Sequence, residues 1–292
     1  MMNPLPSPLI LDKLLQDWLL EDIGRGDRTT DCIFPVDSPK GSGYWIAKEE
    51  GVIAGLPIAK RVFQLLETDV KWHELALEGE KVEKNARIME IEGKMKTLLT
   101  GERVALNLVM RLSGIATMAR KYVEAIEDYP TQLVDTRKTT PGLRILEKYA
   151  SAVGGAMNHR MGLDDGIMIK DNHIQASGGI KKAMQRIRKT MPYPLSIEVE
   201  TSNLEEVTEA VNHQADIIML DNMAVEDMRK AVTFIRQENP LIKIEASGNV
   251  TLNNIRLIAE TGVDYISTSA TITRSNWLDI SMKFGENFYQ FN

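Results

Sequence analysis

The sequence contains very little cysteine, with Cys32 as the only one in 292 residues. An intrachain disulfide is therefore excluded, as is a metal cluster that needs several thiolates. Since this composition suits a reducing compartment, we expect a cytoplasmic protein. The amino-terminal stretch has no basic segment and mixes acidic with apolar residues, so it does not resemble a secretory signal.

Long apolar runs and an excess of positive charge are also missing. No run approaches the roughly 18 apolar residues that a membrane span needs, so we expect no membrane partner. The formal net charge of −6 argues against a surface that coats nucleic acid. Hydrophobic residues make up 43% of the chain and charged residues 26%, which is typical of a globular protein with a sizeable core.

Several well-known catalytic motifs are absent as well. No group of histidine and cysteine residues has the spacing of zinc ligands. The chain has no glycine-rich Walker or Rossmann phosphate loop and no G-x-S-x-G elbow of a serine hydrolase. Any chemistry must therefore come from other side chains.

The first part of the chain has the pattern of a small α+β layer. Apolar residues from Ile10 to Leu19 recur at helical spacing and predict an amphipathic helix, which the glycines of GRGDRTTD end. Two short strands are expected at residues 44–47 and 51–54, followed by a helix around residues 57–67. A long helix is expected from Thr97.

After Pro130, strands and helices alternate regularly. The expected strands are residues 132–135, 166–169, 195–199, 216–220, 242–246 and 265–267. The expected helices are residues 143–153, 180–190, 203–212, 224–237 and 252–260. This spacing predicts βαβ units and a parallel sheet, which is compatible with a barrel and with an open doubly wound sheet.

Polar side chains at the strand ends favour one of these two arrangements. Nearly every expected strand is followed by charged, hydroxyl or small residues, namely Thr136, Arg137 and Lys138; Lys170 and Asp171; Glu200; Asp221 and Asn222; Ser247 and Gly248; and Thr268 and Ser269. In a barrel all strand ends meet at one mouth, where active sites lie. In an open sheet only those near a switch point would meet, so we expect an α/β barrel.

Basic side chains gather at this expected mouth. They are Arg137, Lys138, His159, Arg160 and Lys170. Cations at this density repel one another unless polyanionic ligands offset them, so we expect several carboxylates or phosphates in the substrates. Alternatives stay open for single residues: Thr140 can cap a helix after a solvated loop, Lys170 can form a Schiff base with a carbonyl substrate, and His173 can be an ordinary residue at a helix start.

Two carboxylates and two small-residue loops complete the candidate site. Glu200 and Asp221 follow neighbouring strands, where they can cap the next helices or serve Mg²⁺, ribose hydroxyls or a cationic transition state. The loops EASGN, at 245–249, and STSAT, at 267–271, let backbone N–H groups approach a phosphate closely. Each loop alone is a weak signal, because small-residue turns after strands are common.

Together these residues resemble the quinolinate phosphoribosyltransferase family. The matching stretches, in chain order, are EDIGRGDRTT, GVIAGL, LTGERVALNLVMRLSGIAT, DTRKTTPGLR, LEKYA, GGAMNHRMGLDDGIMIKDNH, EVE, LDNM, EASG and GVDYIS. The resemblance implies an α/β fold. In it, an amino-terminal α/β sandwich over residues 1–115, rejoined by residues of about 272–292, precedes an incomplete α/β barrel over residues 116–271.

The same resemblance implies an activity. The family transfers phosphoribosyl from phosphoribosyl pyrophosphate to quinolinate with decarboxylation, giving nicotinate mononucleotide, pyrophosphate and CO2 in de novo NAD biosynthesis. Mg²⁺ accompanies phosphoribosyl pyrophosphate, and no organic cofactor is needed. The resemblance also implies a homodimer with shared active sites, to which Arg103 contributes across the interface, and it leaves a hexamer of dimers open.

Residue roles follow from the resemblance. Lys138, Lys170, Glu200 and Asp221 are the implied catalytic residues, and Glu200 and Asp221 hold Mg²⁺ through water or substrate. The implied substrate-binding residues are Arg103, Thr136, Arg137, Lys138, His159, Arg160, Lys170, Glu200, Asp221, Ser247, Gly248, Asn249, Thr268, Ser269 and Ala270. The chain departs from the family at Asn249 and Ser269, where glycine is common, and a Cβ at Ser269 would crowd a phosphate.

Three other functions compete with this one. A nicotinate phosphoribosyltransferase, or another pyridine or purine relative, would need fewer cations at the mouth. A non-catalytic homologue that binds an anionic metabolite would be expected to lack Glu200, Asp221 or Arg103, all of which are present. An aldolase-like lyase would use Lys170 as its nucleophile.

Overall fold

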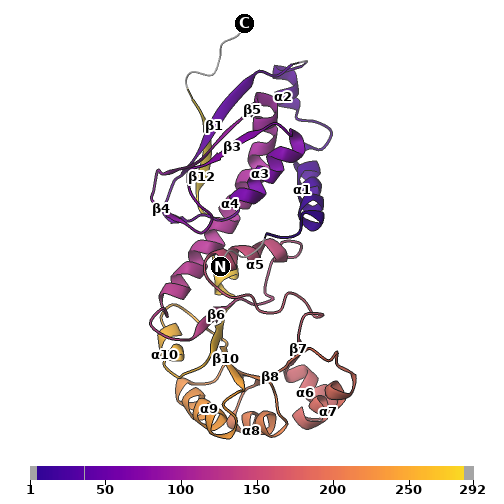
Figure 1. Cartoon of the computed structure of the whole chain (residues 1–292), viewed down its shortest axis with the longest axis vertical. Coiled ribbons are helices and arrows are strands. Elements are labelled where there is room, and N and C mark those ends of the chain that lie inside the picture. The colour runs from indigo at the N-terminus through magenta and orange to yellow at the C-terminus, as the bar shows by residue number, and fades with distance from the viewer. Residues whose placement is uncertain (1–4, 36, 286–292) are drawn as a thin grey trace. The chain divides into compact units, whose positions relative to one another are not determined.

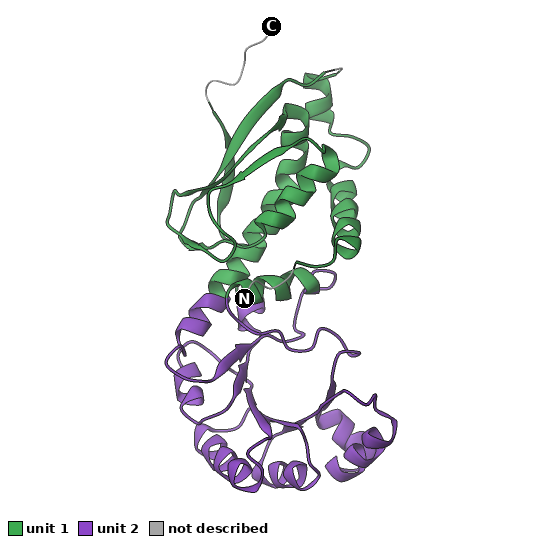
Figure 2. Ribbon diagram, viewed as in Figure 1, with its two compact units in different colours: residues 1–118, 145–154, 275–292 green, residues 119–144, 155–274 purple. Residues whose placement is uncertain are grey.

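The computed structural model describes residues 5–35 and 37–285 and divides into two compact units (Figure 2). Unit 1 comprises Met1–Met118, Ile145–Gly154 and Ser275–Asn292, and unit 2 comprises Ala119–Arg144 and Gly155–Arg274. The first residues of the amino-terminal stretch, and the end of the expected returning segment 272–292, lie outside the described residues. Residues 145–154, which the sequence places with the barrel, belong to unit 1.

Unit 1 contains a four-stranded antiparallel sheet in the order β12–β1–β5–β3. Its strands are β1 (Lys40–Ala47), β3 (Lys71–Glu74), β5 (Arg87–Lys94) and β12 (Ile280–Phe284). A smaller sheet pairs β2 (Gly51–Val52) with β4 (Lys81–Val82). Because Trp45 of β1 lies opposite Met282 of β12, the end of the described chain completes the amino-terminal sheet.

Helices α3 and α4 lie against one face of the larger sheet (Figure 1). The helices of this part of the chain are α1 (Pro8–Ile23), α2 (Arg28–Ile33), α3 (Leu56–Leu66), α4 (Met95–Glu124), which continues into unit 2, and α5 (Arg144–Val153). The ring of the fully buried Trp45 lies 6.5 Å from that of Phe63 on α3, between their centroids. No helix within the described ranges is long and apolar enough to cross a membrane.

Unit 2 contains a six-stranded parallel sheet in the order β6–β11–β10–β9–β8–β7. Its strands are β6 (Gln132–Val134), β7 (Ile167–Ile169), β8 (Ile197–Thr201), β9 (Ile217–Asp221), β10 (Lys243–Ser247) and β11 (Tyr265–Ser267). Its remaining helices are α6 (Asp171–Ser177), α7 (Ile180–Thr190), α8 (Leu204–Asn212), α9 (Val225–Glu238), α10 (Ile255–Ala259) and α11 (Ala270–Thr273).

The sheet of unit 2 curves around a common centre, with helices on its outer side (Figure 1). Its end strands, β6 and β7, do not pair with each other in the described part of the chain, so the barrel is incomplete. One isolated bridge, between Val134 and Met157, extends the β6 edge. The expected α/β fold, with an incomplete barrel and an amino-terminal sheet domain, is confirmed.

The inner side of this barrel carries charged residues. Because successive strand residues point to opposite faces, Glu198 and Glu200 of β8 share one face, and both line cavities inside the barrel. Glu245 and Ser247 of β10 share a face in the same way, and both line the larger cavity. Apolar branched side chains ordinarily fill a barrel interior, so these acids occupy positions where apolar packing would be expected.

Candidate active site

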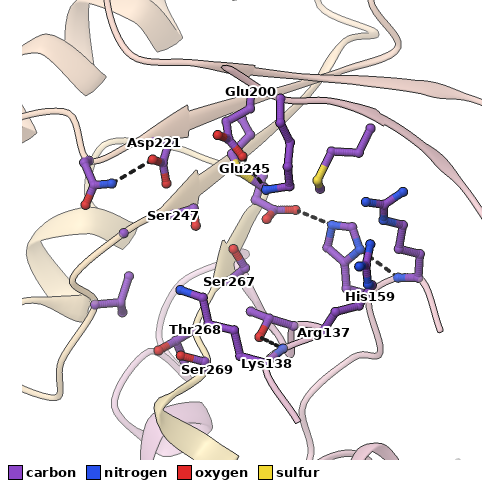
Figure 3. Close-up of a pocket in the computed structure, with 18 of the residues that line it drawn as sticks. Arg137, Lys138, His159, Glu200, Asp221, Glu245, Ser247, Ser267, Thr268 and Ser269 are labelled. Carbon is purple, nitrogen blue, oxygen red and sulfur yellow. Dashed lines mark hydrogen bonds and ion pairs between the residues drawn. The ribbon is translucent and has the colours of Figure 1, made fainter. Parts of the chain in front are cut away.

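A cavity of about 920 Å³ lies at the carboxyl ends of the strands of unit 2 (Figure 3). All the implied substrate-binding residues except Arg103 line it, from Thr136 after β6 to Ala270 after β11. Arg103 belongs to unit 1, where it is exposed on α4. The strand ends of the barrel therefore bring together residues that are more than a hundred positions apart in the chain.

Two arginines, Arg137 and Arg160, line this cavity, and some of their N–H donors have no acceptor among the described residues. The Nε atoms of Arg137 and Arg160 are buried and find no hydrogen-bond partner within the described ranges. Arg160 donates from Nη1 to the carbonyl oxygen of Gly166 at 2.8 Å. Burial, and then the nearby charge of Arg137, lower the pKa of Arg160 from its ordinary value. An anionic ligand would relieve both the repulsion and the missing hydrogen bonds.

A buried aspartate holds the segment that carries His159. Asp135 directly follows β6 and is fully buried. Its carboxylate accepts hydrogen bonds from the side chain of Asn158 at 2.7 Å and from the backbone N–H of His159 at 2.9 Å. The backbone N–H of Arg160 donates to Nδ1 of His159 at 2.7 Å, so the ring proton sits on Nε2. Nε2 is then the ring nitrogen that faces the carboxylates of Glu198 and Glu245.

Lys170 and Glu200 form an ion pair across neighbouring strands. The distance from Lys170 Nζ to Glu200 Oε2 is 2.6 Å, and the two side chains are 43% and 16% exposed. An ammonium engaged in this way does not fit the free amine that a Schiff-base nucleophile requires. The backbone N–H of Lys170 donates to Nδ1 of His173 at 3.0 Å, which confirms His173 as a residue of a helix start, although it also lines the cavity.

Asp221 supplies the second carboxylate on this side of the cavity. It ends β9, and its Oδ2 accepts a hydrogen bond from the side chain of Asn222 at 2.7 Å. Glu200 and Asp221 each use one oxygen in these contacts, and no protein hydrogen bond within the described ranges takes up the other. The two carboxylates thus keep oxygen atoms for a ligand.

The loops after β10 and β11 present backbone N–H groups to the cavity. In the described part of the chain, those of Gly248, Asn249 and Ser269 donate to no protein acceptor. Gly248 has φ +92°, and a Cβ there would overlap the side chain of Asn222. Asn249 has φ +50°, a left-handed conformation that asparagine tolerates better than most residues. Ser269 has φ −84°, so replacing the common glycine there causes no backbone strain.

Glu198 and Glu245 are candidate functional residues that the sequence interpretation missed. Each is 4% exposed, and Figure 3 shows the carboxylate of Glu245 directed at the His159 ring. Burial, and then the charge of Glu198, raise the pKa of Glu245 to about 7. The available signal was an acid in the middle of an apolar strand, as in IEVE and KIEA. Further lining residues that were not singled out are Leu163, Met168, Met219, Val250 and Arg274.

Comparisons with known proteins identify the family of this chain. The profile described as "Quinolinate phosphoribosyl transferase, N-terminal domain" matches residues 27–113, and the one described as "Quinolinate phosphoribosyl transferase, C-terminal domain" matches residues 115–283. The "Probable nicotinate-nucleotide pyrophosphorylase [carboxylating]" of Synechocystis sp. is 62% identical over 286 residues, which cover 98% of this chain and 96% of that protein. The Bacillus subtilis protein of the same name is 45% identical, with 94% and 93% covered.

Solved structures show the same similarity. The nicotinate-nucleotide pyrophosphorylase of Francisella tularensis superimposes with a TM-score of 0.90 at 38% sequence identity. The match covers 98% of this chain and 99% of that one. Both units, the order of their segments and the cavity-lining stretches are therefore accounted for, and this chain belongs to the quinolinate phosphoribosyltransferase family.

Proposed function

We propose that this chain transfers the phosphoribosyl group of phosphoribosyl pyrophosphate to quinolinate with loss of CO2, and so makes nicotinate mononucleotide and pyrophosphate for NAD biosynthesis. The observation that carries the proposal is one cavity lined by under-partnered cations and by two carboxylates. Arg137, Lys138 and Arg160 suit substrates with several negative charges. Glu200 and Asp221 suit a ribose that becomes cationic. Membership of the family supports the same reaction.

The arginines favour a substrate with two carboxylates. A guanidinium group pairs with a carboxylate through a planar fork of donors, and the buried Nε atoms of Arg137 and Arg160 still lack acceptors among the described residues. Quinolinate, with carboxylates on adjacent ring carbons, would supply acceptors to both. Nicotinate, with one carboxylate, would leave a buried donor unpaired, and a site built for a polar group rejects analogues that lack it.

The carboxylates favour the bond exchange at the ribose. The quinolinate nitrogen attacks C1 of the ribose as pyrophosphate leaves, so positive charge develops at C1. Glu200, oriented by Lys170 at 2.6 Å, and Asp221, oriented by Asn222 at 2.7 Å, place negative charge on that side of the cavity. Once the ring nitrogen carries the ribose, the pyridinium accepts the electrons of the breaking carbon–carbon bond, so no organic cofactor is required.

Glu200 and Asp221 also fit a Mg²⁺ ion that arrives with phosphoribosyl pyrophosphate. Each offers a hard oxygen ligand that no protein hydrogen bond occupies within the described ranges. Mg²⁺ commonly binds one or two carboxylates together with substrate phosphates and retained waters. Bound there, it would neutralise charge on the leaving pyrophosphate.

We assign the binding of the 5′-phosphate of phosphoribosyl pyrophosphate to the loops after β10 and β11. The backbone N–H groups of Gly248, Asn249 and Ser269 have no protein acceptor in the described part of the chain, and consecutive N–H groups in turns bind phosphate oxygens well. Phosphate sites after the final strands are common in α/β barrels. This arrangement leaves the basic residues of the opposite side for quinolinate and pyrophosphate.

The proposal includes a homodimer with shared sites and a cytoplasmic location. Arg103 is exposed on α4 and does not line the cavity of unit 2. In the proposed dimer, Arg103 of the partner subunit adds a further cation to the dicarboxylate site. The cytoplasmic location rests on the single cysteine, Cys32.

A side-by-side assay tests the proposed function. Pyrophosphate release from phosphoribosyl pyrophosphate is measured with quinolinate and with nicotinate, each with and without Mg²⁺. We expect release, accompanied by CO2, only with quinolinate and only with Mg²⁺. Equal turnover of the two acids would reject the dicarboxylate assignment. Borohydride trapping of a carbonyl substrate on Lys170 would support the lyase instead.

A further inference from the structure

Three ionisable side chains, those of His159, Glu198 and Glu245, meet inside the barrel. Glu198 lies two residues before Glu200 on β8, and Glu245 lies two residues before Ser247 on β10. Nε2 of His159 lies 3.2 Å from Oε2 of Glu198 and 3.6 Å from Oε2 of Glu245. One ligand atom from each of the three lies within 4.8 Å of the other two. We call His159, Glu198 and Glu245 the buried acid cluster.

Fold stability does not explain the buried acid cluster. The Oε1 atoms of Glu198 and Glu245 are buried and have no hydrogen-bond partner within the described ranges. A buried polar atom left unsatisfied costs about 1–3 kcal/mol, whereas apolar side chains ordinarily fill this layer of a barrel. A costly arrangement that borders a substrate cavity is a candidate for function.

The hydrogen bonds of His159 favour a proton over a metal ion in this cluster. Its Nδ1 accepts the backbone N–H of Arg160 at 2.7 Å, so Nε2 carries the ring proton and points it at the two carboxylates. A metal ion bound by all three side chains would need the lone pair of Nε2. The ring would then have to lose its last proton while Nδ1 stays an acceptor. Two carboxylates forced close together can instead keep one proton between them.

Glu245 is the member best placed to hold that proton. The groups that face it are Glu198 on β8, His159 and Lys170, Ser267 and Tyr265 on β11, and the apolar Met219 on β9. Burial and the charge of Glu198 raise the pKa of its carboxyl group, and the charge of Lys170 opposes this with a smaller effect. The raised pKa favours the uncharged acid form of Glu245, which can donate a proton.

A second cavity reaches the cluster from the other end of the barrel. Its volume is about 460 Å³, and its lining includes Ile217 and Lys243, the first residues of β9 and β10. It shares His159, Arg160 and Glu245 with the substrate cavity. Glu245 thus borders the space for substrate on one side and a separate cavity, with room for water, on the other.

We propose that Glu245 is a further catalytic residue, which donates the proton that replaces CO2 on the pyridine ring. The inference rests on the proposed function. When the bond between ring carbon C2 and its carboxylate breaks, CO2 leaves and the electron pair stays on C2, next to the alkylated nitrogen. In the same step the O–H bond of Glu245 breaks and its proton takes up that electron pair to form the new C2–H bond, so the loss of CO2 depends on the acid. Water in the second cavity then returns a proton to the carboxylate.

Single turnovers of the full-length protein with quinolinate, phosphoribosyl pyrophosphate and Mg²⁺ test this role. In the wild type, pyrophosphate and nicotinate mononucleotide should form at the same rate. Glu245→Gln keeps the size of the side chain but has no acidic proton. We expect it to release pyrophosphate while the dicarboxylate mononucleotide accumulates, with nicotinate mononucleotide formed about 100-fold or more slowly, the size of a typical general-acid contribution.

Two variants accompany this one. Glu245→Asp retains an acid with shorter reach and should restore part of the coupling between the two products. Glu198→Gln removes an equally buried acid and with it the charge that raises the pKa of Glu245. It should therefore separate the two products less than Glu245→Gln does, and the separation should shrink as the pH is lowered. A loss of packing alone would slow both products together and would not separate them.

Each remaining outcome decides the question. The proposal is overturned if a folded Glu245→Gln variant forms pyrophosphate and nicotinate mononucleotide at the same rate. It is also overturned if the wild type binds Zn²⁺ stoichiometrically and Glu245→Gln abolishes that binding. If that variant does not fold, the wild type serves: raising the pH until Glu245 is ionised should make the dicarboxylate intermediate accumulate, and its absence at every pH refutes the role. A wild type that releases no pyrophosphate with quinolinate would refute the proposed function instead.

Discussion

Replacing Lys170 distinguishes its role as a substrate-binding cation from a role in folding. In the free protein its ammonium group lies 2.6 Å from Glu200, but its side chain is 43% exposed. An ion pair this exposed contributes about 1 kcal/mol or less to stability. We therefore expect Lys170→Met to change the free energy of unfolding by no more than about that amount.

The effect on quinolinate affinity should be much larger. Once a substrate anion covers the lysine, removing one partner of a desolvated charge pair costs about 2–5 kcal/mol. At about 1.4 kcal/mol per factor of ten, Kd should rise by roughly 30-fold to several thousand-fold. Lys170→Arg keeps the charge but replaces a compact ammonium with a planar fork. We expect it to weaken binding by about tenfold at most, or about 1.4 kcal/mol.

Titration calorimetry with quinolinate measures both variants, and urea unfolding shows that they are folded. Lys230→Met is the control, because it removes a lysine on the outer helix α9 that also forms an ion pair, with Asp227 at 2.8 Å. Its Kd should equal that of the wild type. If the arginine and methionine variants of Lys170 bind quinolinate equally, Lys170 does not belong to the anion-binding residues and the argument from its charge fails.

Three further predictions concern the dimer, a helix cap and the phosphate loop. Arg103→Ala and Lys170→Ala, each inactive alone, should partly complement after subunit exchange, whereas activity that stays at background would show that each site is built within one chain. The carboxylate of Asp27 accepts the N–H of Thr30 at 3.0 Å. Asp27→Ala should therefore lower the free energy of unfolding by about 0.5–2 kcal/mol. Hydrogen bonds from Thr30 lower the pKa of Asp27 in the folded protein. The stability that Asp27 contributes is therefore present above its pKa in the unfolded chain and is lost as the pH falls through its pKa in the folded protein. A difference in Tm between Asp27→Ala and the wild type that does not shrink in acid would contradict this. Asn249→Gly should keep the KM for phosphoribosyl pyrophosphate, whereas Asn249→Val should raise it, because a β-branched residue is strained at φ +50°; equal values would show that this conformation does not matter.

The barrel strands were predictable because each is a short apolar run with turn or polar residues at its ends. The helix expected at residues 180–190 is observed as α7, Ile180–Thr190. The helices α2, α6 and α11 were missed, since their 6, 7 and 4 residues are too short to show helical periodicity. Local pattern therefore gave the order of elements wherever a segment was long enough to repeat.

Long-range packing was harder to predict. The Tyr149 hydroxyl of α5 donates to Glu78, which lies 71 residues earlier, at 2.7 Å, and this contact belongs to the packing that assigns residues 145–154 to unit 1. No pattern within α5 indicates such a distant partner. The return of the carboxy-terminal residues to unit 1 was expected only from the family resemblance, and their pairing with β1 as strand β12 was not predicted, because ISMKF alone does not show which strand it joins.

In the site, the sequence predicted charge positions better than charge roles. Lysines, arginines and acids directly after strands were expected at one mouth because parallel strands bring their carboxyl ends together, and the cavity contains them. Whether an acid inside a strand faces solvent, helices or the barrel centre depends on the closure of the sheet, which the sequence alone does not show. For that reason Glu198 and Glu245 were overlooked. The tautomer of His159 follows from the backbone N–H of Arg160, a contact that exists only once the segment is folded against Asp135. The function of the cluster therefore has to be argued from hydrogen bonds rather than from residue types.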